Sequence, residues 1–205
     1  MPPKVAGLTG ATLVTAPSVC QSCVWWQSRA DKPVEKDRWR ERAEADWGAW
    51  GTIYYDDDGR VLGSMQYGPS ALFPRSAELP AGPASEDAVL VTCAYLVDPS
   101  TPWVMQSLFL AALGDARQRH AQALETFAYR YPEGESTYER FHVHRTVFPR
   151  GFLSDFGFLT VRAAGRVELV RLELGGLEPV AEPSRASLTR RVREALVPAP
   201  VPQRP

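Results

Sequence analysis

The alternation of apolar and polar positions predicts two hairpins and one buried strand in this chain of 205 residues. Residues 51–55 and 60–67 alternate around Asp56-Asp57-Asp58-Gly59, whose Asp-Gly step suits a tight turn between antiparallel strands. Residues 158–164 and 167–174 predict a second hairpin. Residues 87–97 form a nearly continuous β-rich run, which is typical of a strand buried on both faces.

Helical spacing of apolar residues predicts helices over residues 36–50 and 103–120 and a short helix over 149–156. The apolar stripe that indicates the first of these helices consists of Trp39, Ala43 and Trp47. The stripe that indicates the second consists of Met105, Phe109, Ala112 and Ala116. Residues 123–129 read as a further strand, and a strand, a helix and a strand in this order normally place the two strands parallel. The fold class is therefore predicted as α+β, a mixed sheet flanked by helices.

The ends of the chain differ in composition from its middle, which suggests a domain over residues 20–176. Residues 1–19 are interpreted as an N-terminal extension. Residues 177–205 are interpreted as an amphipathic helix at 187–197 followed by a Pro-rich tail. That helix has a basic face, for which a solvated surface is favoured over a nucleic-acid contact. Residues 68–85, rich in Pro, Gly and Ser, predict a long surface loop holding at most a short helix.

Composition narrows the class of protein. Lys and Arg number 23 against 24 Asp and Glu, so no basic excess points to a nucleic-acid partner. No apolar run approaches the roughly 18 to 20 residues that span a bilayer, so no membrane contact is expected. Three cysteines do not make a disulfide framework and fit a reducing compartment. The expected localisation is cytoplasmic.

Cys20-x-x-Cys23 is half of a zinc site, and His142-x-His144 offers two more ligands. A His-x-His pair is not zinc-finger spacing, however, and Val24-Trp25-Trp26 after Cys23 reads as a packing strand. Structural thiols are therefore favoured and no metal is expected. The turn at Asp56–Asp58 needs no cation to explain it.

A long polar segment over residues 129–150 combines histidines and arginines with aromatic side chains. Long ordered connections often carry function, so this segment is a candidate lining for an acidic or aromatic ligand. A loop folded over the sheet and an interface with a second copy of the chain are the alternatives. Its members are Tyr129, Arg130, Tyr131, Tyr138, Arg140, Phe141, His142, His144 and Arg145.

The order of these elements, with several local motifs, resembles the GNAT (Gcn5-related N-acetyltransferase) superfamily, and in particular actinobacterial-type members with an N-terminal Cys-x-x-Cys-Val-Trp-Trp segment. The resemblance covers residues 20–175. Its motifs here are Cys20-Gln-Ser-Cys23-Val-Trp25-Trp26, Trp47-Gly48, Leu79-Pro80-Ala81-Gly82-Pro83, Asp87-Ala-Val-Leu-Val-Thr-Cys93-Ala-Tyr95-Leu-Val, Ala123-Leu-Glu125-Thr-Phe127-Ala, Phe152-Leu-Ser-Asp-Phe-Gly157-Phe158 and Arg171-Leu-Glu-Leu.

The resemblance implies transfer of an acetyl group from acetyl-CoA to a small-molecule or peptide amine. In such folds the strand that resembles residues 87–97 binds the pantetheine arm through its backbone, and the next loop and helix N-terminus hold the pyrophosphate. The cofactor-binding residues implied here are Tyr95, Leu96, Val97, Trp103, Val104, Met105, Gln106 and Ser107.

The pyrophosphate loop departs from the family pattern Gln/Arg-x-x-Gly-x-Gly/Ala. Residues 100–107 contain no Gly, Arg or Lys, and Trp103 and Val104 would crowd the surface that the anion needs. Ser100 or Thr101 as N-cap with Pro102 at the first helical position would keep some anion binding at the helix dipole. The alternative to an enzyme is a catalytically degenerate GNAT-like module that binds a ligand or a partner protein. In this alternative Trp103 fills the cofactor cleft, and the partner can be a second copy of the chain, which gives a homodimer.

Two residues are candidates for proton transfer. Glu125, on the strand after the crossover helix, is by position the best general base. The alternative for Glu125 is a solvated strand residue or one paired with an arginine. Residues 148–152 contain no Tyr where family enzymes often have one as general acid, so Tyr138, or else Tyr131, is expected to reach the site from the preceding segment.

Overall fold

A computed structural model describes residues 4–98, 100–131 and 148–175. The described strands form one sheet in the order β1-β2-β3-β4-β5-β8-β7, with the short β6 paired to β5. The strands are β1 (Val5–Gly7), β2 (Gly51–Tyr55), β3 (Val61–Pro69), β4 (Ala88–Leu96), β5 (Ala123–Tyr129), β6 (Phe148–Pro149), β7 (Leu159–Ala164) and β8 (Val167–Glu173). Among these described strands, only the pairs β4 with β5 and β5 with β6 run parallel.

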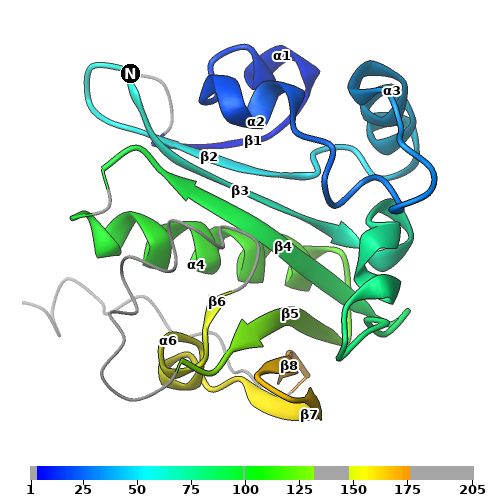
Figure 1. Cartoon of the computed structure of the whole chain (residues 1–205). Helices are drawn as coiled ribbons and strands as arrows, with labels where there is room; N and C mark the ends of the chain where they lie inside the picture. The colour runs from blue at the N-terminus through cyan, green and yellow to red at the C-terminus, as the bar shows by residue number, and fades with distance from the viewer. Residues whose placement is uncertain (1–3, 99, 132–147, 176–205) are drawn as a thin grey trace, which may run out of the picture. The chain divides into compact units, whose positions relative to one another are not determined.

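Helices cover both faces of the sheet, as Figure 1 shows, which confirms the predicted mixed sheet flanked by helices. On the face that we call the N-terminal face lie α1 (Gly10–Leu13), α2 (Ser18–Ser22) and α3 (Lys36–Asp46), with the 3-10 turns η1 (Ser70–Leu72) and η2 (Pro74–Glu78) beside them at its end. On the opposite face, the α4 face, lie α4 (Pro102–Gln118) and α6 (Arg150–Asp155). None of the described helices is long and apolar enough to cross a membrane.

Local patterns account for most of these elements. All four residues of the predicted stripe on α4 are buried, which explains why this helix lies flat on the sheet. Gly59, with a φ of 80°, closes the predicted hairpin between β2 and β3, and the Asp56 carboxylate accepts hydrogen bonds from the backbone N–H groups of Asp58 and Arg60. The parallel pairing of β4 with β5 confirms the predicted crossover.

The N-terminal segment differs from its prediction. Residues 24–26 are not a strand but lead into a turn, because Trp26 must point inward, where it stacks on Phe127 of β5 with ring centroids 5.9 Å apart. Within the residues assigned to an extension, β1 pairs with β2 at the edge of the sheet. Leu8 and Leu13 belong to the same core cluster as Trp26, so this segment helps to seal the N-terminal face.

Candidate active site

The strands β4 and β5 separate part of the way along their length. They pair only from Ala88 with Ala123 to Val91 with Thr126. The last four residues of β4, from Cys93 to Leu96, pair with β3 alone among the described strands, while the end of β5 pairs with β6 and β8. This separation leaves one edge of the second half of β4 without a described strand neighbour.

A β-bulge at Thr92 accounts for the separation. In the register of β3 with β4, Gln66 pairs with Cys93 and Tyr67 pairs with Val91, so Thr92 is the extra residue. A bulge bends the strand that carries it and increases its twist, which turns β4 away from β5. Two buried hydroxyls satisfy carbonyls at the bend: Thr92 Oγ1 donates to the Gln66 carbonyl (3.1 Å), and Thr126 Oγ1 donates to the Val91 carbonyl (2.8 Å).

The backbone of this half of β4 presents hydrogen-bonding groups toward the separation. The N–H of Val97 donates to the Leu62 carbonyl beside β3. Since alternate residues of an antiparallel strand direct their backbone groups to opposite sides, Ala94 and Leu96 direct theirs away from β3. We call the backbone of Ala94 and Leu96 the free edge of β4. Such an edge can bind an extended amide-containing chain as an added strand does.

The loop after β4 leads into α4 where the sequence predicts, but it contains a carboxylate, that of Asp98. Thr101 is the N-cap of α4 and Pro102 its first residue, yet the Thr101 hydroxyl donates to the Asp98 carbonyl (2.5 Å) instead of capping the helix. The Asp98 carboxylate accepts from both the N–H (2.8 Å) and the hydroxyl (2.7 Å) of Ser100, and these bonds hold the pKa of Asp98 below its usual value. A carboxylate therefore lies where the family resemblance implies a pyrophosphate.

The predicted cofactor-binding residues lie around this loop in several different environments. Leu96 contributes to the free edge, whereas Tyr95 and Val97 direct their backbone groups toward β3. Val104 and Met105 are buried residues of α4, so their side chains belong to the core. Trp103 is 47% exposed and meets the Tyr54 ring edge-on (5.5 Å between centroids). Gln106 is exposed, and the Ser107 hydroxyl donates to the Trp103 carbonyl (2.9 Å).

Glu125, the predicted base, is fully buried and paired. Its carboxylate accepts from the Ser85 N–H and hydroxyl, both at 2.7 Å, and from Arg171 Nη1 at 3.1 Å. These contacts agree with the alternative interpretation of Glu125, in which its carboxylate pairs with an arginine. Ser85 also lines a cavity of about 730 Å³, whose lining does not include Glu125. The geometry therefore favours a structural ion pair over a base that meets its substrate.

Several other predicted residues fall outside the described part of the chain: Tyr138, Arg140, Phe141, His142, His144 and Arg145, together with the helix over 187–197. Tyr131, the other candidate acid, is described and its ring meets that of Tyr129 edge-on (4.9 Å between centroids). Cys20, Cys23 and Cys93 form no disulfide, and the described residues contain no group of three or more His, Cys, Asp or Glu placed to hold a metal ion.

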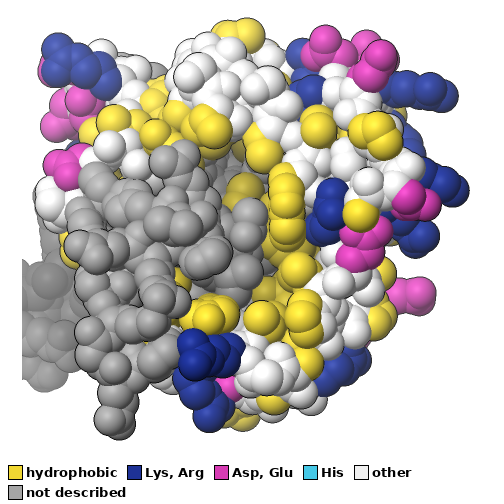
Figure 2. Space-filling model, viewed as in Figure 1, with side chains coloured by type: hydrophobic (Ala, Val, Ile, Leu, Met, Phe, Trp, Pro, Cys, Tyr) yellow, Lys and Arg dark blue, Asp and Glu magenta, His cyan; other side chains and the backbone are white. Residues whose placement is uncertain are grey.

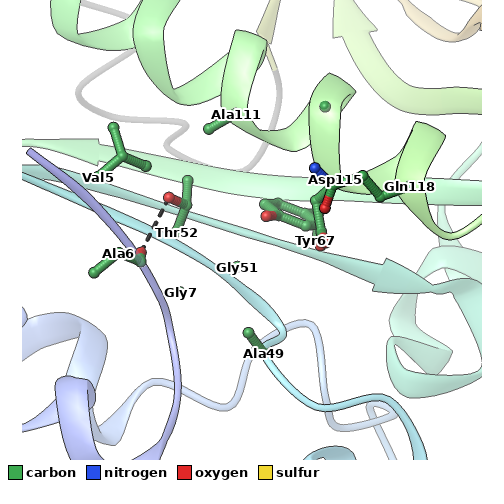
Figure 3. Close-up of a pocket in the computed structure, with 11 residues that line it drawn as sticks. Val5, Ala6, Gly7, Ala49, Gly51, Thr52, Tyr67, Ala111, Asp115 and Gln118 are labelled. Atoms are coloured by element: carbon green, nitrogen blue, oxygen red, sulfur yellow. Dashed lines mark hydrogen bonds between the residues drawn. The ribbon is translucent and has the colours of Figure 1, made fainter. Parts of the chain in front are cut away.

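A cavity of about 470 Å³ lies elsewhere on the α4 face, between α4 and the β1–β2 edge (Figure 3). Most of its lining is small, with Thr52, Tyr67, Asp115 and Gln118 as its polar side chains. Burial and the neighbouring Asp115 carboxylate raise the pKa of Tyr67, so its hydroxyl stays protonated. None of the predicted cofactor residues lines this cavity.

The charges on the described surface are mixed. Figure 2 shows basic and acidic side chains together around the rim of the face in view, while hydrophobic side chains run through its middle. No broad basic area is visible among the described residues on this face, in keeping with the net charge of −1. This face therefore offers no extended surface for a phosphate backbone.

No protein-family model and no curated protein matches the sequence. Solved structures resemble the fold. A ribosomal-protein-alanine N-acetyltransferase from Brucella melitensis is 14% identical, with a TM-score of 0.46 over 83% of this chain and 99% of that one. The PaiA N-acetyltransferase from Thermoplasma acidophilum, in complex with coenzyme A, is 12% identical with a TM-score of 0.46, over 82% and 97%. A GNAT-family acetyltransferase from Staphylococcus aureus Mu50 is 7% identical, also at 0.46, over 83% and 98%. These likenesses concern the fold at low identity and do not decide an activity.

Proposed function

We propose that the chain is an N-acyltransferase that moves an acetyl group from acetyl-CoA to a small-molecule or peptide amine. The observation that carries the proposal is the free edge of β4, which begins where a bulge turns β4 away from β5. The pantetheine arm of CoA contains two amides and can add to this edge by backbone hydrogen bonds. The resemblance of the sequence to the GNAT superfamily supports the same ligand.

The transfer needs little besides binding and one proton acceptor. A neutral amine attacks the thioester carbonyl carbon, the carbon–sulfur bond breaks, and CoA leaves as a thiolate that takes up a proton. The free edge would hold the thioester in place, which lowers the entropic part of the barrier. Because Glu125 is fully paired, we do not assign it as the base, and Tyr138 remains the predicted acid.

A second candidate is a ligand- or partner-binding module without catalysis. Asp98 and Trp103 favour it, because a carboxylate and an exposed indole occupy the loop that a pyrophosphate would need. In this case the free edge binds an extended ligand that carries no strong negative charge.

Calorimetric titrations of the full chain at near-millimolar concentration with acetyl-CoA and with S-acetylpantetheine test the proposal. We expect heat with both ligands, and release of free thiol when amines are added. Absence of heat with both would overturn the proposal, and binding without thiol release across a broad amine panel would favour the second candidate.

A matched pair of variants tests the free edge itself. Leu96→Pro and Leu96→Ala both remove most of the side chain, but only the proline also removes the N–H. Loss of one hydrogen bond predicts roughly five- to tenfold weaker binding of S-acetylpantetheine to the proline variant than to the alanine variant. Equal affinities would mean that this N–H does not meet the ligand.

A further inference from the structure

Lysine is rare in this chain, and one lysine has unusual surroundings. The sequence contains only Lys4, Lys32 and Lys36 among its 23 basic residues. Lys4 is exposed and pairs with Asp57 (3.2 Å), and Lys32 is exposed. Lys36 is half-buried, and within the described residues no carboxylate pairs with it. Its Nζ instead donates to the Cys23 carbonyl (2.8 Å) and lies 5.0 Å from the centre of the Trp39 ring.

Burial makes the Lys36 ammonium ion easier to deprotonate than that of an exposed lysine, although the Trp39 ring and the Cys23 carbonyl stabilise the charged form. Burial lowers the pKa of Lys36, although the nearby thiols of Cys93, Cys23 and Cys20 oppose the shift. Lys36 is also the first residue of α3, where the positive end of the helix dipole disfavours a second positive charge. A lysine amine becomes a nucleophile when it loses its proton, which is why lysine rather than arginine serves such roles.

The Lys36 amine lies on the N-terminal face of the sheet, the face to which Cys93, next to the free edge of β4, also belongs. Cys20 of α2 touches Ser64 of β3 (3.9 Å between Sγ and Oγ), which places the thiols on the N-terminal face. Ser64 is two residues from Gln66, whose partner across the strands is Cys93, so Cys93 shares this face. Cys93 directly follows the bulge at Thr92 and directly precedes Ala94 of the free edge.

Two buried polar atoms beside this face have no hydrogen-bond partner within the part of the chain that the structure describes. They are Trp26 Nε1 and Gln27 Oε1, and both belong to residues that are more than nine-tenths buried. The Gln27 amide nitrogen binds Gln66 Oε1 (2.6 Å), which places Gln27 next to the residue that pairs with Cys93. The unused indole N–H is a hydrogen-bond donor for which an amide or thioester oxygen is a suitable acceptor.

We propose that Lys36 is an internal acyl acceptor, whose Nζ attacks the carbonyl carbon of an acyl thioester bound along the free edge of β4. A nitrogen–carbon bond forms, the carbon–sulfur bond breaks, and the proton lost from nitrogen reaches the departing CoA thiolate directly or through solvent. The products are Nε-acyl-Lys36 and free CoA. This inference rests on the proposed acyl-CoA function and adds a modification site to it.

The test is a time course of the full chain with acetyl-CoA, digested after arginine and analysed by mass spectrometry. Cleavage after Arg29 and Arg38 gives one peptide that contains both Lys32 and Lys36, so the control lysine is measured in the same fragment. Because a bound thioester makes the reaction effectively unimolecular, we expect Lys36 to gain acetyl at least about tenfold faster than Lys32 or Lys4. Its rate should not depend on protein concentration.

Variants and a second reagent separate this inference from the proposed function. Lys36→Arg keeps a cation that can donate to the Cys23 carbonyl, and it should abolish the fast acetylation while acetyl-CoA binding persists. Trace acetic anhydride should also label Lys36 ahead of Lys32, since it reports amine reactivity without CoA binding. If acetyl-CoA binds or an added amine is acetylated while Lys36 gains acetyl no faster than Lys32, this inference fails and the proposed function stands.

Two further outcomes would overturn the inference. Acetyl groups that hydroxylamine removes from Cys20, Cys23 or Cys93, with none on Lys36, would identify a thiol as the acceptor. No acetyl-CoA binding and no acetylation at all would remove the proposed function and this inference together, and calorimetry on the same samples distinguishes that case from the others.

Discussion

Two buried carboxylates, one on each face of the sheet, show how single residues hold this fold together. Glu125 lies on the N-terminal face with Ser85 and Arg171, and Glu168 lies on the α4 face with arginines on either side. A buried ion pair adds little net stability by itself, but removing one partner leaves an uncompensated charge. Each carboxylate therefore depends on its arginines.

Replacing Arg171 with methionine should expose this dependence. Arg171 also bonds Asp87 and Glu173, but only Glu125 is fully buried among its partners. We expect Arg171→Met to lower the free energy of unfolding by about 3–5 kcal/mol, measured by urea denaturation, and Glu125→Gln in the same chain to recover part of it. Arg60→Met, which breaks an exposed pair with Asp58, is the control and should change stability by less than about 1 kcal/mol. A loss below about 1 kcal/mol for Arg171→Met would contradict this account.

Glu168 should make stability depend on pH. Burial alone would raise the pKa of Glu168, but hydrogen bonds from Thr160, Arg130 and Arg150 hold it below its usual value. As the pH falls, Glu168 therefore takes up a proton in the unfolded chain before it does so in the folded chain. Its contribution to the free energy of unfolding is present above a pH of about 4.3 and is lost as the pH falls through the pKa of the folded state. Urea denaturation between pH 6 and pH 3 should show a steeper loss for the wild type than for Glu168→Gln. Parallel curves would exclude this role for Glu168.

Asp98 should weaken the binding of phosphorylated ligands only. Asp98→Asn keeps an oxygen that can accept from Ser100 but removes the charge beside the start of α4. For an exposed charge we expect roughly two- to fivefold tighter binding of acetyl-CoA, and no change for S-acetylpantetheine, which has no pyrophosphate. Asp57→Asn, in the exposed turn after β2, is the matched control. An equal gain for both ligands would mean that Asp98 acts through the structure of the loop.

At the scale of elements, the close approach of α4 to the sheet depends on a glycine in β3. A Cβ on Gly63 would lie 2.8 Å from the Tyr95 carbonyl oxygen and 3.0 Å from Val104 Cγ1 in the first turn of α4. Gly63→Ala should destabilise the chain by about 1–3 kcal/mol, because the helix start must move from the strand. Gly114→Ala, within the same helix and free of neighbours within 4 Å, should instead stabilise it by about 0.5–1 kcal/mol. Thermal unfolding of both variants measures the two effects, and a shift in the same direction would refute this explanation.

The elements that sequence patterns predict well are those with a local cause. The stripe on α4 and the Asp-Gly turn after β2 depend on residues close in sequence, and both are confirmed. The residues around Thr92 contain no sequence pattern that predicts a bulge. The bulge depends on the pairing register of β4 with β3 and on the point where β5 separates from β4. The turn at Trp26 was missed for a similar reason: its partner Phe127 lies about a hundred residues further along the chain.

The candidate site shows the same division between local and long-range causes. The position of Glu125 on a strand follows from the pattern around it, but its partners Ser85 and Arg171 are 40 and 46 residues away in sequence. The start of α4 at Pro102 was predicted from its cap residues, whereas the bonds from Ser100 to the Asp98 carboxylate were not. The local sequence does not distinguish Lys36 from any other charged residue at a helix start, because only the tertiary structure brings it to three thiols.

At the scale of the described molecule, one core joins the N-terminal segment to both halves of the sheet. The buried cluster on the N-terminal face runs from Leu8 and Trp26 through Ile53 of β2 to Phe127 of β5 and Leu169 of β8. The segment before α3 therefore bridges the two sets of strands on either side of the β4–β5 separation. Strands that pair over only four residues gain a second connection from the side chains stacked across them.

Trp26 is the residue on which this bridge should depend most, and its neighbour supplies the control. Trp26 is 2% exposed and stacks on Phe127, whereas Trp25 is 38% exposed and lies under Arg75. Trp26→Ala removes a large buried ring and should lower the free energy of unfolding by about 3–5 kcal/mol, while Trp25→Ala should cost less than about 1.5 kcal/mol. Urea denaturation gives both values. Hydrogen exchange on Trp26→Ala should be faster in β4 and in β5 together, because the ring belongs to the cluster that contains Leu90 of β4 and Phe127 of β5. Faster exchange confined to residues 8–30 would mean that the N-terminal segment only covers the sheet and does not hold its halves together.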